Sequence, residues 1–142
     1  MEVSMDERIR AAIHERSRDG KLRCSKAFQI ATELGVPPLA VGKAADELGI
    51  HLTYCQLGLF GYGDQGAVVK PAESVPPELE AAIRQRLQQL GTDRLPCLTA
   101  WEIASQFRMP RMHVANAVEA LGVRIGPCQL GAFSGEKKHD DD

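Results

Sequence analysis

Four cysteines carry the most reactive side chains of this 142-residue chain, and they occur as two pairs at one spacing. Thirty residues separate Cys24 from Cys55, and thirty separate Cys97 from Cys128. Such thiols serve as metal ligands, as redox-active groups or as small buried apolar residues. Neither pair has the Cys-x2-Cys spacing that marks a zinc ribbon. All three interpretations therefore stay open, and a buried apolar role is the leading one.

The spacing recurs because one stretch of the chain is duplicated. Residues 22–60 align without a gap to residues 95–133 at an offset of 73, and fifteen of the 39 aligned positions are identical. Both copies contain the tetrapeptide Cys-Gln-Leu-Gly. A fixed internal period is the mark of a repeated supersecondary unit. The sequence therefore predicts a first module over 1–63, a linker over 64–76, a second module over 77–135 and a disordered tail over 136–142.

Composition and charge are those of an ordinary globular protein, with 44% hydrophobic and 25% charged residues. Lys and Arg number 17 against 19 Asp and Glu, which gives a net charge of −2. Any nucleic-acid interface must therefore depend on local basic patches. No apolar run approaches the roughly 20 residues of a membrane span, and the charged N-terminal stretch is unlike a secretory signal. We expect a cytoplasmic protein with no membrane partner and no structural disulfide.

The order of the predicted elements is the same in both copies. Apolar residues at helical spacing predict helices over 6–18, 25–34 and 39–48 in the first copy and over 77–90 at the start of the second. Alternating apolar and polar residues predict a strand over 50–54, and a short strand is expected just before the second helix. The fold class predicted is mainly α with short β-hairpins, an α+β protein.

Two short helices separated by a tight turn occupy the centre of each copy. In the first copy this stretch is I-A-T-E-L-G-V-P-P-L-A-V-G-K-A-A-D-E-L-G-I, Ile30 to Ile50, which resembles the helix-turn-helix core of the winged helix-turn-helix superfamily of bacterial and archaeal transcription regulators. Ala31 lies where the helices cross and Gly35 at the turn. In the second copy Arg108 replaces the turn glycine, which requires left-handed backbone at a cost of about 1 kcal/mol. The resemblance implies two tandem winged modules that bind DNA and regulate transcription.

In that superfamily the second helix of the motif reads bases in the major groove. Carried onto the first copy, this helix offers Lys43 beside Asp46 and Glu47, whose carboxylates repel phosphates. The second copy offers Arg111 and Asn116, which can bind guanine and adenine bidentately. The second module is therefore the better predicted reader of double-stranded DNA, in a monomer or a homodimer. The candidate DNA-binding residues are Arg108, Arg111, His113, Asn116, Lys43, Lys26 and Arg23.

Phosphate contacts are expected from basic residues near the start of each motif. They are Arg16, Arg18, Lys21, Arg23 and Lys26 in the first copy and Arg84, Arg86, Arg94 and Arg124 in the second. Charged residues also occur on helix faces simply because those faces are solvated. Which of these residues contact phosphate therefore depends on where the fold places them.

An alternative function is a protein-interaction module, or a metal or redox sensor, that does not bind DNA. In a winged helix the strand before the motif lies beside the strand after it, so the resemblance implies that Cys24 approaches Cys55 and Cys97 approaches Cys128. Four thiolates brought together would suit zinc or an iron–sulfur cluster, the one cofactor considered. The chain has no Gly-rich phosphate loop, His-Glu-x-x-His or nucleophile elbow, so we expect no enzyme.

Overall fold

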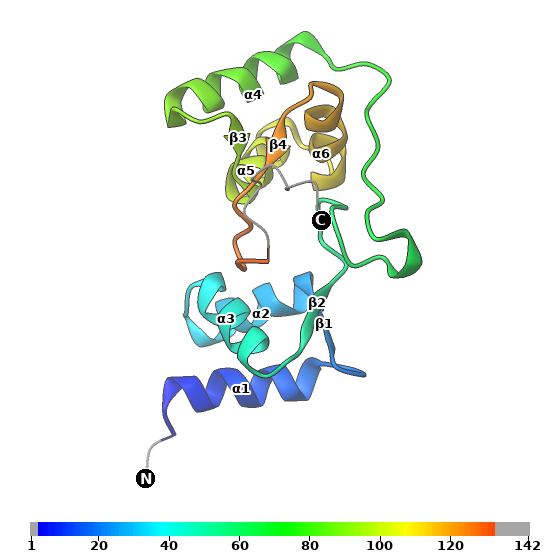
Figure 1. Ribbon diagram of the computed structural model, residues 1–142. Helices are drawn as coiled ribbons and strands as arrows, with labels where there is room; N and C mark the ends of the chain where they lie inside the picture. Colours follow the sequence, from blue (N-terminus) through cyan, green and yellow to red (C-terminus); the bar gives the residue numbers. More distant parts are fainter. Residues whose placement is uncertain (1–2, 133–142) are drawn as a thin grey trace. The chain divides into compact units, whose positions relative to one another are not determined.

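The computed structural model describes residues 3–132, which are mainly α-helical with two small pairs of strands (Figure 1). These residues divide into two compact units, one made of residues 3–68 and 130–132 and the other of residues 69–129. The chain passes between them inside the predicted linker, 64–76. The predicted disordered tail, 136–142, lies outside the described residues. Within residues 3–132, no helix is both long and apolar enough to cross a bilayer.

The first unit contains three α-helices, and local sequence signals account for their ends. Ser4 caps the first helix by accepting a hydrogen bond from the backbone N–H of Glu7 at 3.1 Å. Gly35 ends the second helix with left-handed backbone. In chain order the elements are α1 (Met5–Arg16), β1 (Lys21–Arg23), α2 (Cys24–Leu34), α3 (Pro38–Glu47), β2 (His51–Thr53) and a 3-10 turn, η1 (Gly63–Gln65).

The described part of the second unit repeats the order of helices and strands found in the first. Pro77 begins its first helix, a position where proline loses no hydrogen bond, and Gly91 caps the end. The observed bounds of this helix confirm the prediction of a helix over 77–90. The elements are α4 (Pro77–Leu90), β3 (Arg94–Leu95), α5 (Cys97–Phe107), α6 (Arg111–Ala120) and β4 (Arg124–Ile125).

Both strand pairs are parallel, which corrects the predicted short β-hairpins. β1 pairs with β2, placing Lys21 opposite His51, and β3 pairs with β4, placing Arg94 opposite Arg124. The two motif helices lie between the paired strands in sequence, and such a helical crossover returns the chain in its original direction. A hairpin would have needed a tight turn instead. Alternating hydrophobicity located the second strand but carries no information on its direction.

Each unit has its own core, built from the same repeated positions. The apolar residues that the sequence places on the inner faces of the helices and on the first strand are 0% exposed. Removing such side chains from water is the main favourable term in folding. They are Ile13, Leu22, Ile30 and Val41 in the first unit, and the equivalent Ile83, Leu95, Ile103 and Val114 in the second.

Arg108 has the left-handed backbone that the sequence predicted, with φ +55° against +67° at the equivalent Gly35. Replacing Arg108 by glycine removes the strain of left-handed backbone, about 1–2 kcal/mol, from the folded protein. It also raises the entropy of the unfolded chain, which opposes folding by about 0.4–1 kcal/mol. We expect Arg108→Gly to stabilise the protein by about 1 kcal/mol in urea unfolding. The matched control, Gly35→Ala, is expected to destabilise it by about 1 kcal/mol. A loss of stability in Arg108→Gly would contradict this account of the turn.

Candidate nucleic-acid interface

Asn116, the predicted adenine reader on α6, is bound by the segment that precedes α4. Its side-chain Oδ1 accepts a hydrogen bond from the backbone N–H of Lys70 at 3.0 Å. Its carbonyl oxygen accepts another from the N–H of Ala72 at 2.9 Å. The neighbouring Ala115 is only 1% exposed. Because residues 70–72 lie against this face of α6, the geometry disfavours Asn116 as a base reader.

Arg111, the predicted guanine reader, is held against its own unit. Its guanidinium carbon lies 3.5 Å from the ring centroid of Trp101 on α5. A cation placed over an aromatic face gains about 0.5–2 kcal/mol, which favours this position over an extended one. The first turn of α6 therefore uses Arg111 for internal packing. A contact from Arg111 to a base would require this stacking to be given up.

The remaining residues predicted on the turn and the motif helices are exposed. Arg108 lies in the turn, His113 on α6 and Lys43 on α3. On α3, however, Lys43 is close in sequence to the exposed carboxylates Asp46 and Glu47. Glu47 accepts a hydrogen bond from Arg10 at 3.3 Å, and its charge opposes phosphate binding at this helix. Neither motif helix thus presents a continuous basic surface.

Basic side chains lie opposite each other on both strand pairs. Lys21 faces His51 across β1 and β2, and Arg94 faces Arg124 across β3 and β4. Residues in register on adjacent strands project from the same face of the pair. Basic residue types therefore recur at equivalent register positions of both units, where they could meet an anionic ligand.

In the first unit this basic face continues beyond the paired residues. Arg23 ends β1, Lys26 lies in the first turn of α2, and both are exposed, as is Lys21. Across residues 3–132, none of these three forms an ion pair with an acidic side chain. Their charges are therefore available to an external anion.

Other basic residues predicted to contact phosphate are engaged within the protein. Arg16 pairs with Glu33 and Arg86 pairs with Glu102, each linking the first helix of its unit to the second. Arg84 pairs with Glu80 four residues earlier on α4, and Arg18 donates to backbone carbonyls of its own turn. Partly exposed ion pairs of this kind contribute about 0–1 kcal/mol each. These arginines make contacts within their own units. They are therefore less available to phosphate than Lys21, Arg23 and Lys26.

The four cysteines are buried, with exposed fractions of 4% to 9%, and none is in a disulfide. The glutamine of each Cys-Gln-Leu-Gly holds the other thiol of its unit: Gln56 Nε2 donates to Cys24 Sγ at 3.9 Å, and Gln129 Nε2 donates to Cys97 Sγ at 3.4 Å. Among residues 3–132, no three His, Cys, Asp or Glu side chains gather as possible metal ligands. The zinc or iron–sulfur hypothesis gains no geometric support, and the glutamine contact was not predicted from the sequence.

Tyr62 packs beside these thiols, and its environment disfavours the phenolate. Its hydroxyl donates to the carbonyl oxygen of Cys55 at 2.6 Å. Burial raises its pKa above the ordinary value, and the nearby charges of Cys55, Cys24 and Tyr54 raise it further. Because the pKa of Tyr62 is higher in the folded than in the unfolded protein, the protonated phenol contributes to the free energy of unfolding. This contribution is complete below the unfolded pKa, about 10. It is lost as the pH rises through the folded pKa.

A Tyr54→Phe variant leaves Tyr62 as the only tyrosine, since the chain has two. We expect the ultraviolet titration of tyrosinate in this variant to have its midpoint above that of the same variant unfolded in urea. The physical reason is the desolvation of Tyr62 and its hydrogen bond to the Cys55 carbonyl. A midpoint equal to or below the unfolded one would show that the Tyr62 hydroxyl is freely solvated.

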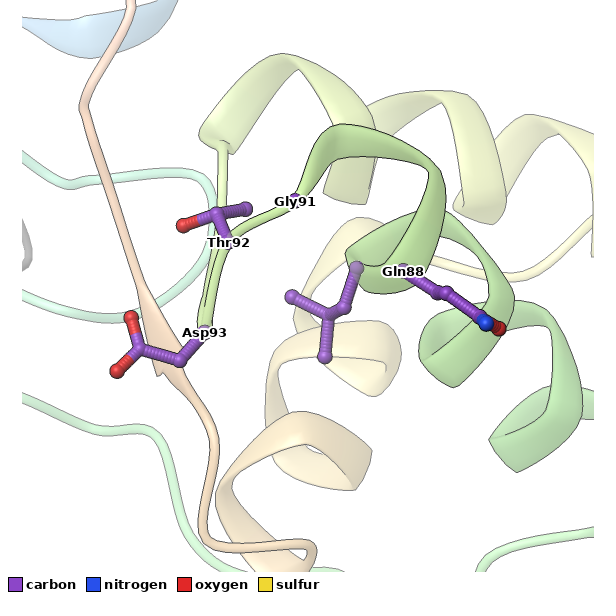
Figure 2. Close-up of a pocket in the computed structure, with 5 residues that line it drawn as sticks. Gln88, Gly91, Thr92 and Asp93 are labelled. Carbon is purple, nitrogen blue, oxygen red and sulfur yellow. The ribbon is translucent and has the colours of Figure 1, made fainter.

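A shallow hollow lies where α4 ends, lined by Leu87, Gln88, Gly91, Thr92 and Asp93 (Figure 2). In Figure 2 the Gln88 side chain extends from the helix, whereas Thr92 and Asp93 lie on the connection that follows it. Thr92 Oγ1 is occupied in accepting the N–H of Arg94 at 3.1 Å.

The structure therefore separates the predicted DNA contacts into two groups. Arg111 and Asn116 are engaged inside the second unit, whereas Lys21, His51 and Arg124 on the strand pairs are exposed and Arg94 is half-buried. Comparison of the chain with protein families, with curated proteins and with solved structures finds no match. Of the strand-pair residues, Lys21, Arg94 and Arg124 were among the expected phosphate contacts, and His51 was not; its alignment with Arg124 is the signal that could have identified it.

Proposed function

We propose that the chain is a non-catalytic DNA-binding protein with two tandem winged helix-turn-helix units that contact the phosphate backbone through their strand pairs. The observation that carries this proposal is the pairing of Arg94 with Arg124, at positions equivalent to Lys21 and His51. Basic residues gathered on neighbouring strands raise the local positive potential, which attracts phosphates. Phosphates neutralised by Lys and Arg release counterions, which supplies most of the affinity of such a contact.

Base reading by α6 is not part of this proposal. Asn116 is hydrogen-bonded to residues 70–72, and Arg111 is stacked on Trp101. Contacts to phosphate position a protein on a duplex but carry no direct sequence information. We therefore expect duplex binding with weak sequence preference. A role in transcription regulation, which the sequence resemblance implies, is proposed to operate through this backbone contact.

The test is a fluorescence anisotropy titration of a labelled mixed-sequence duplex at several salt concentrations. Four basic residues, Lys21, Arg23, Arg94 and Arg124, are proposed to contact phosphates. The logarithm of the affinity should then fall with the logarithm of salt at a slope of about −3 to −4. No binding even at the lowest salt concentration would rule out the proposal.

A second candidate function is binding of another protein through the same chain. It is favoured by the coverage of α6 by residues 70–72 and by the net charge of −2. Both features suit a helix-turn-helix unit that no longer enters a groove. The titration above separates the two candidates, because a protein-interaction module would leave the duplex unbound at every salt concentration.

A further inference from the structure

Both tyrosines of the chain lie at one end of the basic strand pair of the first unit. Tyr54 directly follows β2 and is 46% exposed, an unusually open position for so large a ring. The guanidinium carbon of Arg23 lies 4.7 Å from the centroid of the Tyr54 ring. Tyr62 packs edge-on, with the ring centroids 5.2 Å apart and an interplanar angle of 85°. Arg23, Tyr54 and Tyr62 are called the aromatic cluster below.

The local backbone holds the aromatic cluster in place. Tyr54 has φ +51°, a left-handed conformation that is rare for a bulky residue. Its N–H donates to the carbonyl oxygen of Gly61 at 3.2 Å, and a Cβ at Gly61 would lie 2.5 Å from the Tyr54 nitrogen. The hydroxyl of Tyr62 is fixed on the Cys55 carbonyl. The exposed ring is therefore presented in a preset orientation, which reduces the entropy lost on binding.

The second unit lacks this cluster although it repeats the fold. The positions aligned with Arg23 and Tyr54 are occupied by Pro96 and Pro127. The second unit nevertheless forms the same parallel strand pair between equivalent helices. The shared fold therefore does not need the aromatic cluster, and a structural role common to both units does not explain it.

We infer that the aromatic cluster binds an unpaired base of a single-stranded nucleic acid, while Lys21, Lys26 and His51 contact the adjoining phosphates. This inference rests on the proposed function, because it needs an anionic backbone on the β1–β2 face. Bases stack on tyrosine rings and on arginine guanidinium planes, whereas the bases of a duplex are already stacked on each other.

The charges around the aromatic cluster suit a polyanion. Lys21, Arg23 and Lys26 are exposed, and within the described part of the chain no acidic side chain pairs with them. The acidic residues next to these elements in sequence, Asp19 and Asp64, are also exposed and form no ion pair with them there. Positive charge beside an exposed ring is the combination that binds single strands without sequence preference.

The test compares fluorescein-labelled dT and U dodecamers with a labelled duplex in anisotropy titrations of the full chain. Tyr54→Ala should weaken binding of the single strands by about 5- to 100-fold, the range found when one stacking ring is removed. Its affinity for duplex should change by less than about twofold. Tyr54→Phe keeps the ring and should bind like the unsubstituted protein. Tyr54→Gly suits the positive φ and should reproduce the loss seen in Tyr54→Ala.

The outcomes separate this inference from the proposed function. If neither the duplex nor the single strands bind, the proposed function fails. If the duplex binds but the tyrosine variants hold single strands as tightly as the unsubstituted protein, the aromatic cluster is not a base-binding site. A loss confined to the single strands in both ring-less variants, with circular dichroism unchanged, supports the inference. The dT and U arms then tell whether DNA, RNA or both are bound.

Discussion

Charge reversal of the second strand pair, Arg94→Glu with Arg124→Glu, is expected to weaken duplex binding by about 100-fold or more at low salt. Arg94 and Arg124 are register partners on β3 and β4, so the change replaces two neighbouring basic residues with acidic ones. The slope of log affinity against log salt should become shallower by about 2, since two phosphate contacts are lost. Fluorescence anisotropy over a salt series measures both quantities.

A matched control separates this local effect from a change in net charge. Arg8→Glu with Arg84→Glu changes the net charge by the same amount, at exposed positions on α1 and α4 that belong to neither strand pair. The control should keep the affinity within about threefold, because all four proposed phosphate contacts stay in place. Equal losses in both double variants would show that the strand pairs are not the interface.

The second large effect concerns the repeated core. Ile30→Ala on α2 and Ile103→Ala on α5 each remove most of a fully buried side chain, and each is expected to cost about 2–5 kcal/mol. Each unit has about 60 to 70 described residues, a size at which a domain has only marginal stability, so a loss of this size is expected to unfold much of the affected unit. Urea unfolding followed by circular dichroism measures the change.

The control for the core variants is Gln29→Ala, an exposed position on the same helix. It should change the free energy of unfolding by no more than about 0.5 kcal/mol. Similar losses at residues 29 and 30 would mean that the apolar stripe does not define the buried face of α2.

Much of the fold follows from patterns that occur twice in the sequence. The stripe that contains Ile30 and Ile103 identified the buried helix faces, and the alignment of Arg108 with Gly35 predicted left-handed backbone at a non-glycine residue. Local signals also set the bounds of α4, which starts at a proline and ends before a glycine. These features depend on short-range periodicity and turn chemistry, which a single sequence carries directly.

The candidate interface was less predictable because it depends on contacts between residues far apart in the chain. The hydrogen bond from Lys70 to Asn116 and the stacking of Arg111 on Trp101 have no local signature. Strand direction is similarly hidden, because a parallel strand alternates apolar and polar residues as an antiparallel one does. The sequence thus indicated that α6 carries side chains able to read bases. It did not indicate that these side chains contact other residues of the same unit.

The most direct measurement is a titration of the isotope-labelled protein with a short DNA duplex, followed by the backbone amide signals in two-dimensional NMR. The account predicts that the largest shifts occur in Lys21–Arg23, His51–Thr53, Arg94–Leu95 and Arg124–Ile125. The amides of Arg111–Ala120 should shift little, because residues 70–72 and Trp101 already occupy the groups that would read bases. Shifts concentrated in α6 and α3, with the strands unaffected, would contradict the account.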